Sequence, residues 1–146
     1  MSEKPEKTKV LFVCTGNMCR SQMAEGWAKR LKSETIEAYS AGVSPAGVSS
    51  RAIAVMAEAD VDISSHKSQH VDEFSGIEFD HVITLCDNAK ERCPVFAGNA
   101  RLVHRAFHDP VMMMGTDDEI MAAFRKVRDE IKAFIETLPE SLEAEV

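Results

Sequence analysis

The sequence has no apolar run that approaches the ~20 residues needed to span a bilayer. Its first residues, Ser2 to Lys7, are charged and lack the apolar stretch of a secretory signal peptide, so we expect a cytoplasmic protein without membrane contact. Basic residues are the minority, with 17 Lys and Arg against 24 Asp and Glu. The net charge of −7 excludes a global basic surface for nucleic acid, although backbone dipoles and one arginine can still form a local anion site.

Internal repeats and long Gly, Ser or Pro linkers are also absent. We therefore predict a single domain over residues 1–146, with flexible ends at 1–8 and about 140–146. The chain has four cysteines, which in a reducing compartment are poor candidates for static disulfides. They can be inert core thiols, metal ligands or redox-active groups.

Short β-rich apolar runs alternate with segments of helical periodicity. Strands are expected at 10–13, 36–41, 80–85 and 101–107. Helices are expected from about Ser21 to Leu31, from Ser49 or Ser50 to about Ala59, and as a short polar segment at 87–92. A last helix, capped by Asp117 or Asp118, carries an apolar stripe of Ile120, Phe124, Val127, Ile131, Phe134 and Leu138. The acidic tail from Glu136 to Glu145 is predicted to form a solvated end.

This alternation predicts an open parallel α/β sheet, which binds ligands beyond the carboxyl ends of its strands. Cys14 ends the first strand, Cys86 follows the third and Asp109 follows the fourth. Because parallel strands end at one edge of the sheet, we expect these three side chains to converge there.

The segment between the first strand and the first helix has the features of an oxyanion-binding loop. Its backbone N–H groups point toward the positive end of the helix dipole, and Gly16 permits backbone geometry that is forbidden to most residues. Arg20 adds a planar fork of donors, and the same field favours the thiolate form of Cys14 as a nucleophile, with Ser21 able to donate to it. The substrate-binding residues are predicted to be Thr15, Gly16, Asn17, Met18, Cys19, Arg20 and Ser21. The alternative is a buried cysteine beside a surface arginine.

The segment Val13 to Ser21 resembles the phosphate loop of the low-molecular-weight tyrosine phosphatases. Gln22 to Trp27 resembles the arsenate reductase branch more closely, since the phosphatases usually have proline where this chain has Gln22. The similarity extends to Tyr39–Gly42, Thr84–Cys86 and Asp109-Pro110. It implies a four-stranded parallel sheet flanked by helices, in the flavodoxin-like order 2-1-3-4.

Cys86 and Cys93 are seven residues apart, which on a regular helix separates them by about 10.5 Å along the axis. A disulfide needs Cα atoms within roughly 7 Å, so a helical segment would have to unwind before these cysteines could pair. The polar stretch between them has little core packing to oppose unwinding. We therefore predict a two-state redox element, against the alternative of one core thiol and one incidental thiol.

The resemblance implies that Cys86 and Cys93 are the second and third redox cysteines of a thioredoxin-coupled arsenate reductase. Cys14 would attack arsenate while Asp109 protonates the leaving oxygen, and Cys86 would then displace arsenite. Cys93 would move the disulfide to the pair Cys86–Cys93 for reduction by thioredoxin. Phosphate and sulfate would compete with arsenate for the loop. Cys19 has no role in this scheme and is predicted to be a packing thiol, and the cysteine spacing does not match a zinc site.

Two rival functions stay open. The first is a low-molecular-weight protein tyrosine phosphatase acting through a Cys14 phosphoenzyme, and the second is a non-enzymatic anion-binding or redox-sensing module. The phosphatases usually carry tyrosines after Asp109-Pro110, whereas this chain has Val111 to Met114 there. Asp109-Pro110 is also a common turn sequence. A weak phosphatase activity would follow from the shared loop.

No tightly bound cofactor is expected. Some relatives bind potassium near the loop, and Asn17, Glu25 and Ser40 match three of the four positions. Gln69 stands where an aspartate is expected, and this loss of charge weakens the site. Asn17 is expected to hold the shape of the loop by hydrogen bonds and Glu25 to be a solvated helix residue. The five histidines form no evident ligand set, and a monomer is the default.

Overall fold

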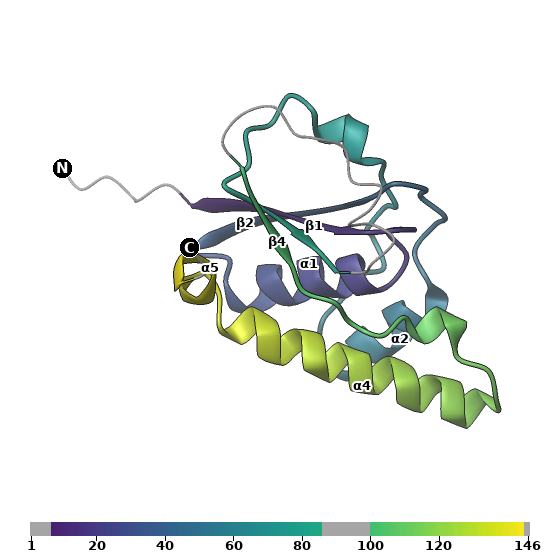
Figure 1. The fold of residues 1–146 in the computed structure, drawn as a ribbon. Coiled ribbons are helices and arrows are strands. Elements are labelled where there is room, and N and C mark those ends of the chain that lie inside the picture. The colour runs from purple at the N-terminus through teal and green to yellow at the C-terminus, as the bar shows by residue number, and fades with distance from the viewer. Residues whose placement is uncertain (1–6, 86–99, 145–146) are drawn as a thin grey trace.

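The computed structural model describes residues 7–85 and 100–144 (Figure 1). Four strands form one parallel sheet in the order β2-β1-β3-β4: β1 (Thr8–Cys14), β2 (Ile36–Gly42), β3 (His81–Thr84) and β4 (Arg101–His104). This order and direction confirm the predicted sheet. β4 is shorter than predicted, because its pairing with β3 ends at Thr84 and His104.

The central strand shows why the apolar runs become parallel strands. Val10 to Val13 of β1 are all 0% exposed, with β2 on one side and β3 on the other. A strand that is covered on both faces needs a continuous apolar run rather than an alternating one.

Helices cover the sheet. They are α1 (Arg20–Leu31), α2 (Ser50–Glu58), α4 (Asp117–Glu136) and α5 (Glu140–Ala144), with 3-10 turns η1 (Val71–Phe74) and η2 (Pro110–Met112). Figure 1 shows α1, α4 and α5 on one side of the sheet and η1 on the other. None of the helices in the described part of the chain combines the length and hydrophobicity needed to cross a membrane.

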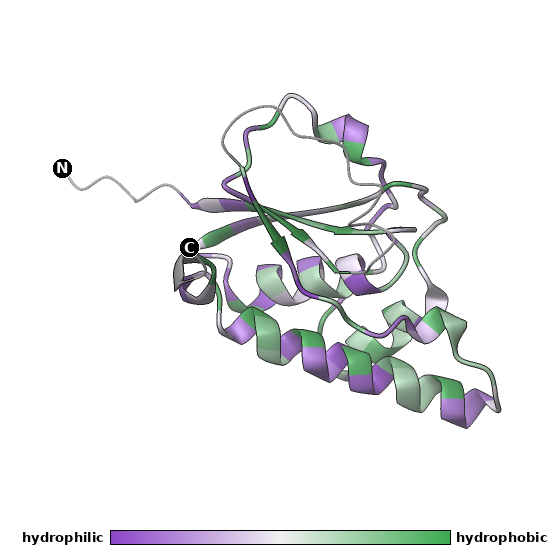
Figure 2. Ribbon diagram, viewed as in Figure 1, coloured by the Kyte–Doolittle hydropathy of each residue, from purple (hydrophilic) through white to green (hydrophobic). Residues whose placement is uncertain are grey.

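The long helix α4 presents its predicted stripe to the core. Its apolar residues alternate with polar bands along the helix (Figure 2), and the buried members are Phe124, Val127, Ile131, Phe134 and Leu138, the last just beyond the helix end. The predicted cap at Asp117 or Asp118 is wrong. Thr116 is the N-cap, with its hydroxyl accepting from the Glu119 N–H at 3.2 Å and the Glu119 carboxylate accepting from the Thr116 N–H at 3.0 Å.

Two further expectations need correction. Leu31, assigned to the apolar face of the first helix, is 39% exposed because it is the last residue of α1. The acidic end is not simply solvated, because Leu138 and Leu142 are 0% exposed and residues from Glu140 form α5. The polar segment predicted at 87–92 lies outside the described residues.

Candidate functional site

The loop between β1 and α1 is held in shape by its own carbonyl groups. Three of them accept hydrogen bonds from main-chain N–H groups of the segment 44–49: Thr15 from Ser44 at 2.8 Å, Gly16 from Ala46 at 2.9 Å and Met18 from Ser49 at 2.9 Å. In a trans peptide the C=O and the following N–H point in opposite directions. Anchoring the carbonyls on segment 44–49 therefore leaves the following N–H groups directed away from it, as an oxyanion cradle requires.

Asn17 is the centre of the loop's polar contacts. Its backbone is left-handed, with φ 49°, and its side chain is 0% exposed. The amide nitrogen donates to Ser21 Oγ at 2.7 Å and to Ser40 Oγ at 3.1 Å. The amide oxygen accepts from Gln22 Nε2 at 2.9 Å and from the Gln69 N–H at 2.8 Å. These contacts agree with the expected role of Asn17 in holding the loop.

The predicted nucleophile lies at the base of the loop. Cys14 is 2% exposed, and its Sγ is 2.9 Å from the Oγ of Ser21. Because Ser21 Oγ already accepts a hydrogen bond from Asn17, its own proton is available to Cys14. The hydroxyl of Ser21, on the first turn of α1, thus lies within hydrogen-bond distance of the Cys14 sulfur.

Arg20 and Asp109 face each other across the loop. Arg20 Nη2 lies 3.2 Å from Asp109 Oδ2, and Arg20 Nη1 donates to the Phe107 carbonyl at 3.3 Å. Arg20 Nε is buried and has no hydrogen-bond partner among the described residues. Asp109 also accepts from the Val111 N–H at 3.0 Å, which fixes it at the start of η2. The guanidinium group of Arg20 and the carboxylate of Asp109 are therefore held beside each other at the loop.

Cys14, Arg20 and Asp109 line a common cavity of about 240 Å³, which is large enough for a tetrahedral oxyanion. The loop contributes all of its predicted substrate-binding residues except Asn17 and Ser21, and Ser44, Ala46, Asp109 and Val111 complete the wall. A larger cavity of about 630 Å³ lies between His108, Met113 and α4, but its described lining contains no cysteine. Of these two cavities, only the smaller is lined by cysteines of the described residues, Cys14 and Cys19.

Cys19 behaves as a buried thiol. It is 2% exposed, and its Sγ lies 3.8 Å from Asp109 Oδ1. Burial raises the pKa of Cys19 far above its ordinary value, and the neighbouring Cys14 and Asp109 charges raise it further. The thiol is thus protonated at neutral pH, which agrees with a packing role.

The expected convergence of functional groups is seen for Cys14 and Asp109, which line the same cavity. Cys86 and Cys93 lie outside the described residues. The end of β3 is close to the site, because Thr84 pairs with Val13 and the Leu85 N–H donates to the Val13 carbonyl at 2.8 Å.

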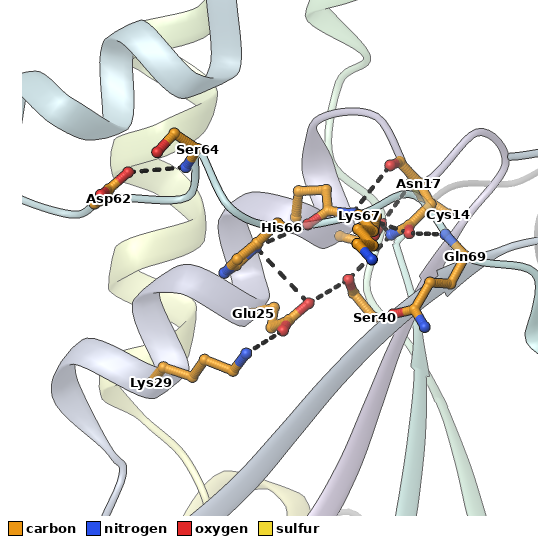
Figure 3. Close-up of polar contacts among 12 residues, drawn as sticks. Cys14, Asn17, Glu25, Lys29, Ser40, Asp62, Ser64, His66, Lys67 and Gln69 are labelled. Atoms are coloured by element: carbon orange, nitrogen blue, oxygen red, sulfur yellow. Dashed lines mark hydrogen bonds and ion pairs between the residues drawn. The ribbon is translucent and has the colours of Figure 1, made fainter. Parts of the chain in front are cut away.

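The three residues matched to a potassium site are already bonded to protein groups (Figure 3). Ser40 Oγ accepts from Asn17 and donates to Glu25 at 2.5 Å, and the Glu25 carboxylate also pairs with Lys29. The Glu25 side chain is only 12% exposed, so the expectation of a solvated residue is wrong. With the Lys29 ammonium at the Glu25 carboxylate, this donor set does not fit a resident potassium ion, and the weak potassium site expected from Gln69 stays a prediction.

Sequence reasoning missed two residues behind the loop, Gln22 and His66. Gln22 is 0% exposed, and its Oε1 lies 2.9 Å from His66 Nδ1. Burial lowers the pKa of His66, and Lys29 lowers it too, against the opposing charges of Glu25 and Asp62. The only local signal was the glutamine at a position where the related phosphatases have proline.

Comparison with known proteins matches residues 9–146 to the family described as low molecular weight phosphotyrosine protein phosphatase. An arsenate reductase of Halalkalibacterium halodurans is 44% identical over 135 residues, covering 92% of this chain and 97% of the relative. A solved arsenate reductase in the phosphate binding state has a TM-score of 0.69 and 34% identity, covering 90% of this chain and 95% of its own. A low molecular weight protein tyrosine phosphatase from T. tengcongensis has a TM-score of 0.74 and 29% identity, covering 92% and 99%.

Proposed function

Because the chain belongs to the low molecular weight phosphotyrosine protein phosphatase family, we propose that its loop binds a tetrahedral oxyanion and that the chain reduces arsenate to arsenite. The observation that carries the proposal is the position of Cys14, 2.9 Å from Ser21 Oγ, in the cavity that Arg20 and Asp109 also line. Among the chemistries that such a site can perform, the arsenate reductase relatives support arsenate reduction.

In the first step, arsenate binds to the loop N–H groups and to Arg20. The Cys14 thiolate attacks arsenic, and an S–As bond replaces an As–O bond. Asp109 supplies the proton that lets the oxygen leave as water. The paired geometry of Arg20 and Asp109 supports these two roles, because each carries its group to the same cavity.

In the following steps, two further thiols provide the electrons. Cys86 attacks the Cys14 sulfur, the S–As electron pair leaves with arsenic as arsenite, and a Cys14–Cys86 disulfide remains. Cys93 then attacks Cys86 and frees Cys14, leaving Cys86–Cys93 for reduction by a thioredoxin-type dithiol. The spacing of the two cysteines and the resemblance of Cys93-Pro94 to the third redox cysteine support this relay. Such a relay needs a compartment that keeps thiols reduced, so we place the protein in the cytoplasm. We take a monomer as the default oligomeric state.

The alternative is a phosphatase reaction through a Cys14 phosphoenzyme. It needs the loop, Arg20 and Asp109, but neither Cys86 nor Cys93. The residues after Asp109 argue against a phosphotyrosine substrate, since Met112 and Met114 are exposed where the phosphatases carry tyrosines. A weak phosphatase activity is consistent with the family.

The Cys86→Ser variant distinguishes the reductase reaction from the phosphatase reaction. The purified chain is mixed with arsenate, thioredoxin, thioredoxin reductase and NADPH, and NADPH oxidation is followed. We expect turnover by the wild type, none by Cys86→Ser, and unchanged hydrolysis of a small phosphoester by that variant. Mass spectrometry after arsenate exposure without reductant should find residues 86 and 93 joined. Free thiols at both positions together with unchanged arsenate would refute the reductase proposal.

A further inference from the structure

Gln22, on the first turn of α1, connects the oxyanion loop to a distant part of the chain. Its Nε2 donates to three acceptors: the Asn17 carbonyl at 3.2 Å, Asn17 Oδ1 at 2.9 Å and the Lys67 carbonyl at 3.0 Å. Its Oε1 is 2.9 Å from His66 Nδ1. Figure 3 shows Lys67 beside Asn17 and His66 nearer Glu25.

We propose that Gln22 is a positioning residue, which holds Asn17 in its left-handed conformation and thereby sets the cradle and the Ser21 hydroxyl on Cys14. Gln22 is not among the residues that line the cavity, so it acts through its contacts with Asn17 and with segment 66–69. The inference rests on the oxyanion-binding part of the proposed function and names a residue that controls it.

The orientation of the Gln22 amide is determined by its surroundings. All three acceptors of Nε2 are oxygens, and an amide turned by 180° would place its own oxygen against them. Since Gln22 Oε1 can only accept, His66 must donate from Nδ1. The amide is therefore locked, and its two N–H bonds are available only to Asn17 and Lys67.

Ser68 and Gln69, which follow the Gln22 partners His66 and Lys67 in the chain, contact the loop at Gly16 and Asn17. Ser68 Oγ donates to the Gly16 carbonyl at 3.1 Å, and the Gln69 N–H donates to Asn17 Oδ1 at 2.8 Å. Segment 66–69 thus contacts both residues of the Gly16–Asn17 peptide, and Gln22 connects this segment to α1 through the Lys67 carbonyl. The effect reaches the nucleophile in two further contacts, from Asn17 Nδ2 to Ser21 Oγ and from Ser21 Oγ to Cys14 Sγ.

Three variants separate this role from simple packing. Gln22→Met keeps the volume and removes all polar contacts, and Gln22→Glu keeps an acceptor for His66 but removes the donor. Gln22→Asn keeps a buried amide that is one methylene too short to reach both Asn17 and Lys67. Thr116→Ala is the control for lost stability, because it removes a helix cap that takes no part in the loop's contacts.

The probe is inorganic phosphate, titrated into each variant by calorimetry. We expect the phosphate Kd to rise at least about tenfold in Gln22→Met and Gln22→Glu, because a displaced loop loses its donor geometry. The rate of Cys14 alkylation by iodoacetamide at pH 7 should fall in the same variants. Thr116→Ala should change neither quantity at a temperature where it is fully folded.

A phosphate Kd within about twofold of wild type in folded Gln22→Met or Gln22→Glu would overturn the inference. If those two variants do not fold, Gln22→Asn decides by the same criterion. The outcome is independent of arsenate chemistry. A wild-type chain that binds phosphate but forms no arsenite would refute the reductase proposal and leave the role of Gln22 intact.

Discussion

Replacing Gly42 by alanine should distort the oxyanion loop, although Gly42 is not itself a loop residue. Gly42 is the last residue of β2 and pairs with Cys14. A Cβ atom built on it would lie 2.7 Å from the Thr15 carbonyl oxygen and 2.8 Å from the Asn17 nitrogen. Both are backbone atoms of the loop, so no flexible side chain can move aside.

The size of the effect follows from these distances. A carbon atom normally approaches a carbonyl oxygen no closer than about 3.3 Å, so Thr15 must retreat by about 0.6 Å. A displacement of about 1 Å at reacting groups can cost ~100-fold in rate. We therefore expect kcat/KM for arsenate to fall about 10- to 100-fold, which corresponds to about 1.4–2.7 kcal/mol of transition-state stabilisation. The strain should also lower the free energy of unfolding by about 1–3 kcal/mol.

The assay is steady-state NADPH oxidation in the thioredoxin-coupled system, together with phosphate binding by calorimetry. Gly76→Ala is the matched control, because a Cβ atom there meets no heavy atom within 4 Å and the backbone is not left-handed. The control should retain wild-type activity and phosphate affinity. Gly42→Ala with kcat/KM and phosphate affinity within about threefold of wild type would refute the argument that close backbone approach shapes the loop.

Thr116→Ala should lower the free energy of unfolding by about 1 kcal/mol in urea titration, because α4 loses its capping box; an unchanged midpoint would contradict this. Burial lowers the pKa of His66, so the wild type should lose stability as pH falls below about 6.5, where the unfolded chain takes up the proton more readily. In His66→Gln the free energy of unfolding should fall less steeply between pH 7 and 5 than in the wild type. Parallel curves of unfolding free energy against pH for the two proteins would count against this role of His66. Asp109→Asn should slow the first, Cys14-dependent step about 10²- to 10⁴-fold in single-turnover experiments, and a near-normal rate would exclude the acid role.

Features encoded by local spacing were predictable from the sequence. The run Val10 to Val13 became the central strand, and the stripe of α4 became its buried face, because both patterns depend only on neighbours along the chain. The same is true of Cys14 and Arg20, whose positions follow from one strand-loop-helix unit.

Features that depend on tertiary contacts were not predictable. Gln22 meets His66 across 44 positions of sequence, and neither residue has a local pattern that indicates the contact. Glu25 was expected in solvent because helix charges usually are, but Ser40 and Lys29 bind it. Leu142 stands among acidic residues in the sequence, which gave no indication that it is buried. The choice of Thr116 over Asp117 as the N-cap of α4 depended on the backbone angles of one residue.

The anchoring of the loop on residues 44–49 responds differently to a side-chain substitution in this segment and to a change in its length. All three anchors, at Ser44, Ala46 and Ser49, are main-chain N–H groups, which nearly every amino acid can supply. Pro45, which has no N–H, occupies an intervening position where none of these bonds is needed. These three hydrogen bonds therefore depend little on the identity of the side chains at 44, 46 and 49, whereas an insertion or deletion of a single residue would shift the anchoring N–H groups relative to the carbonyls that they bind.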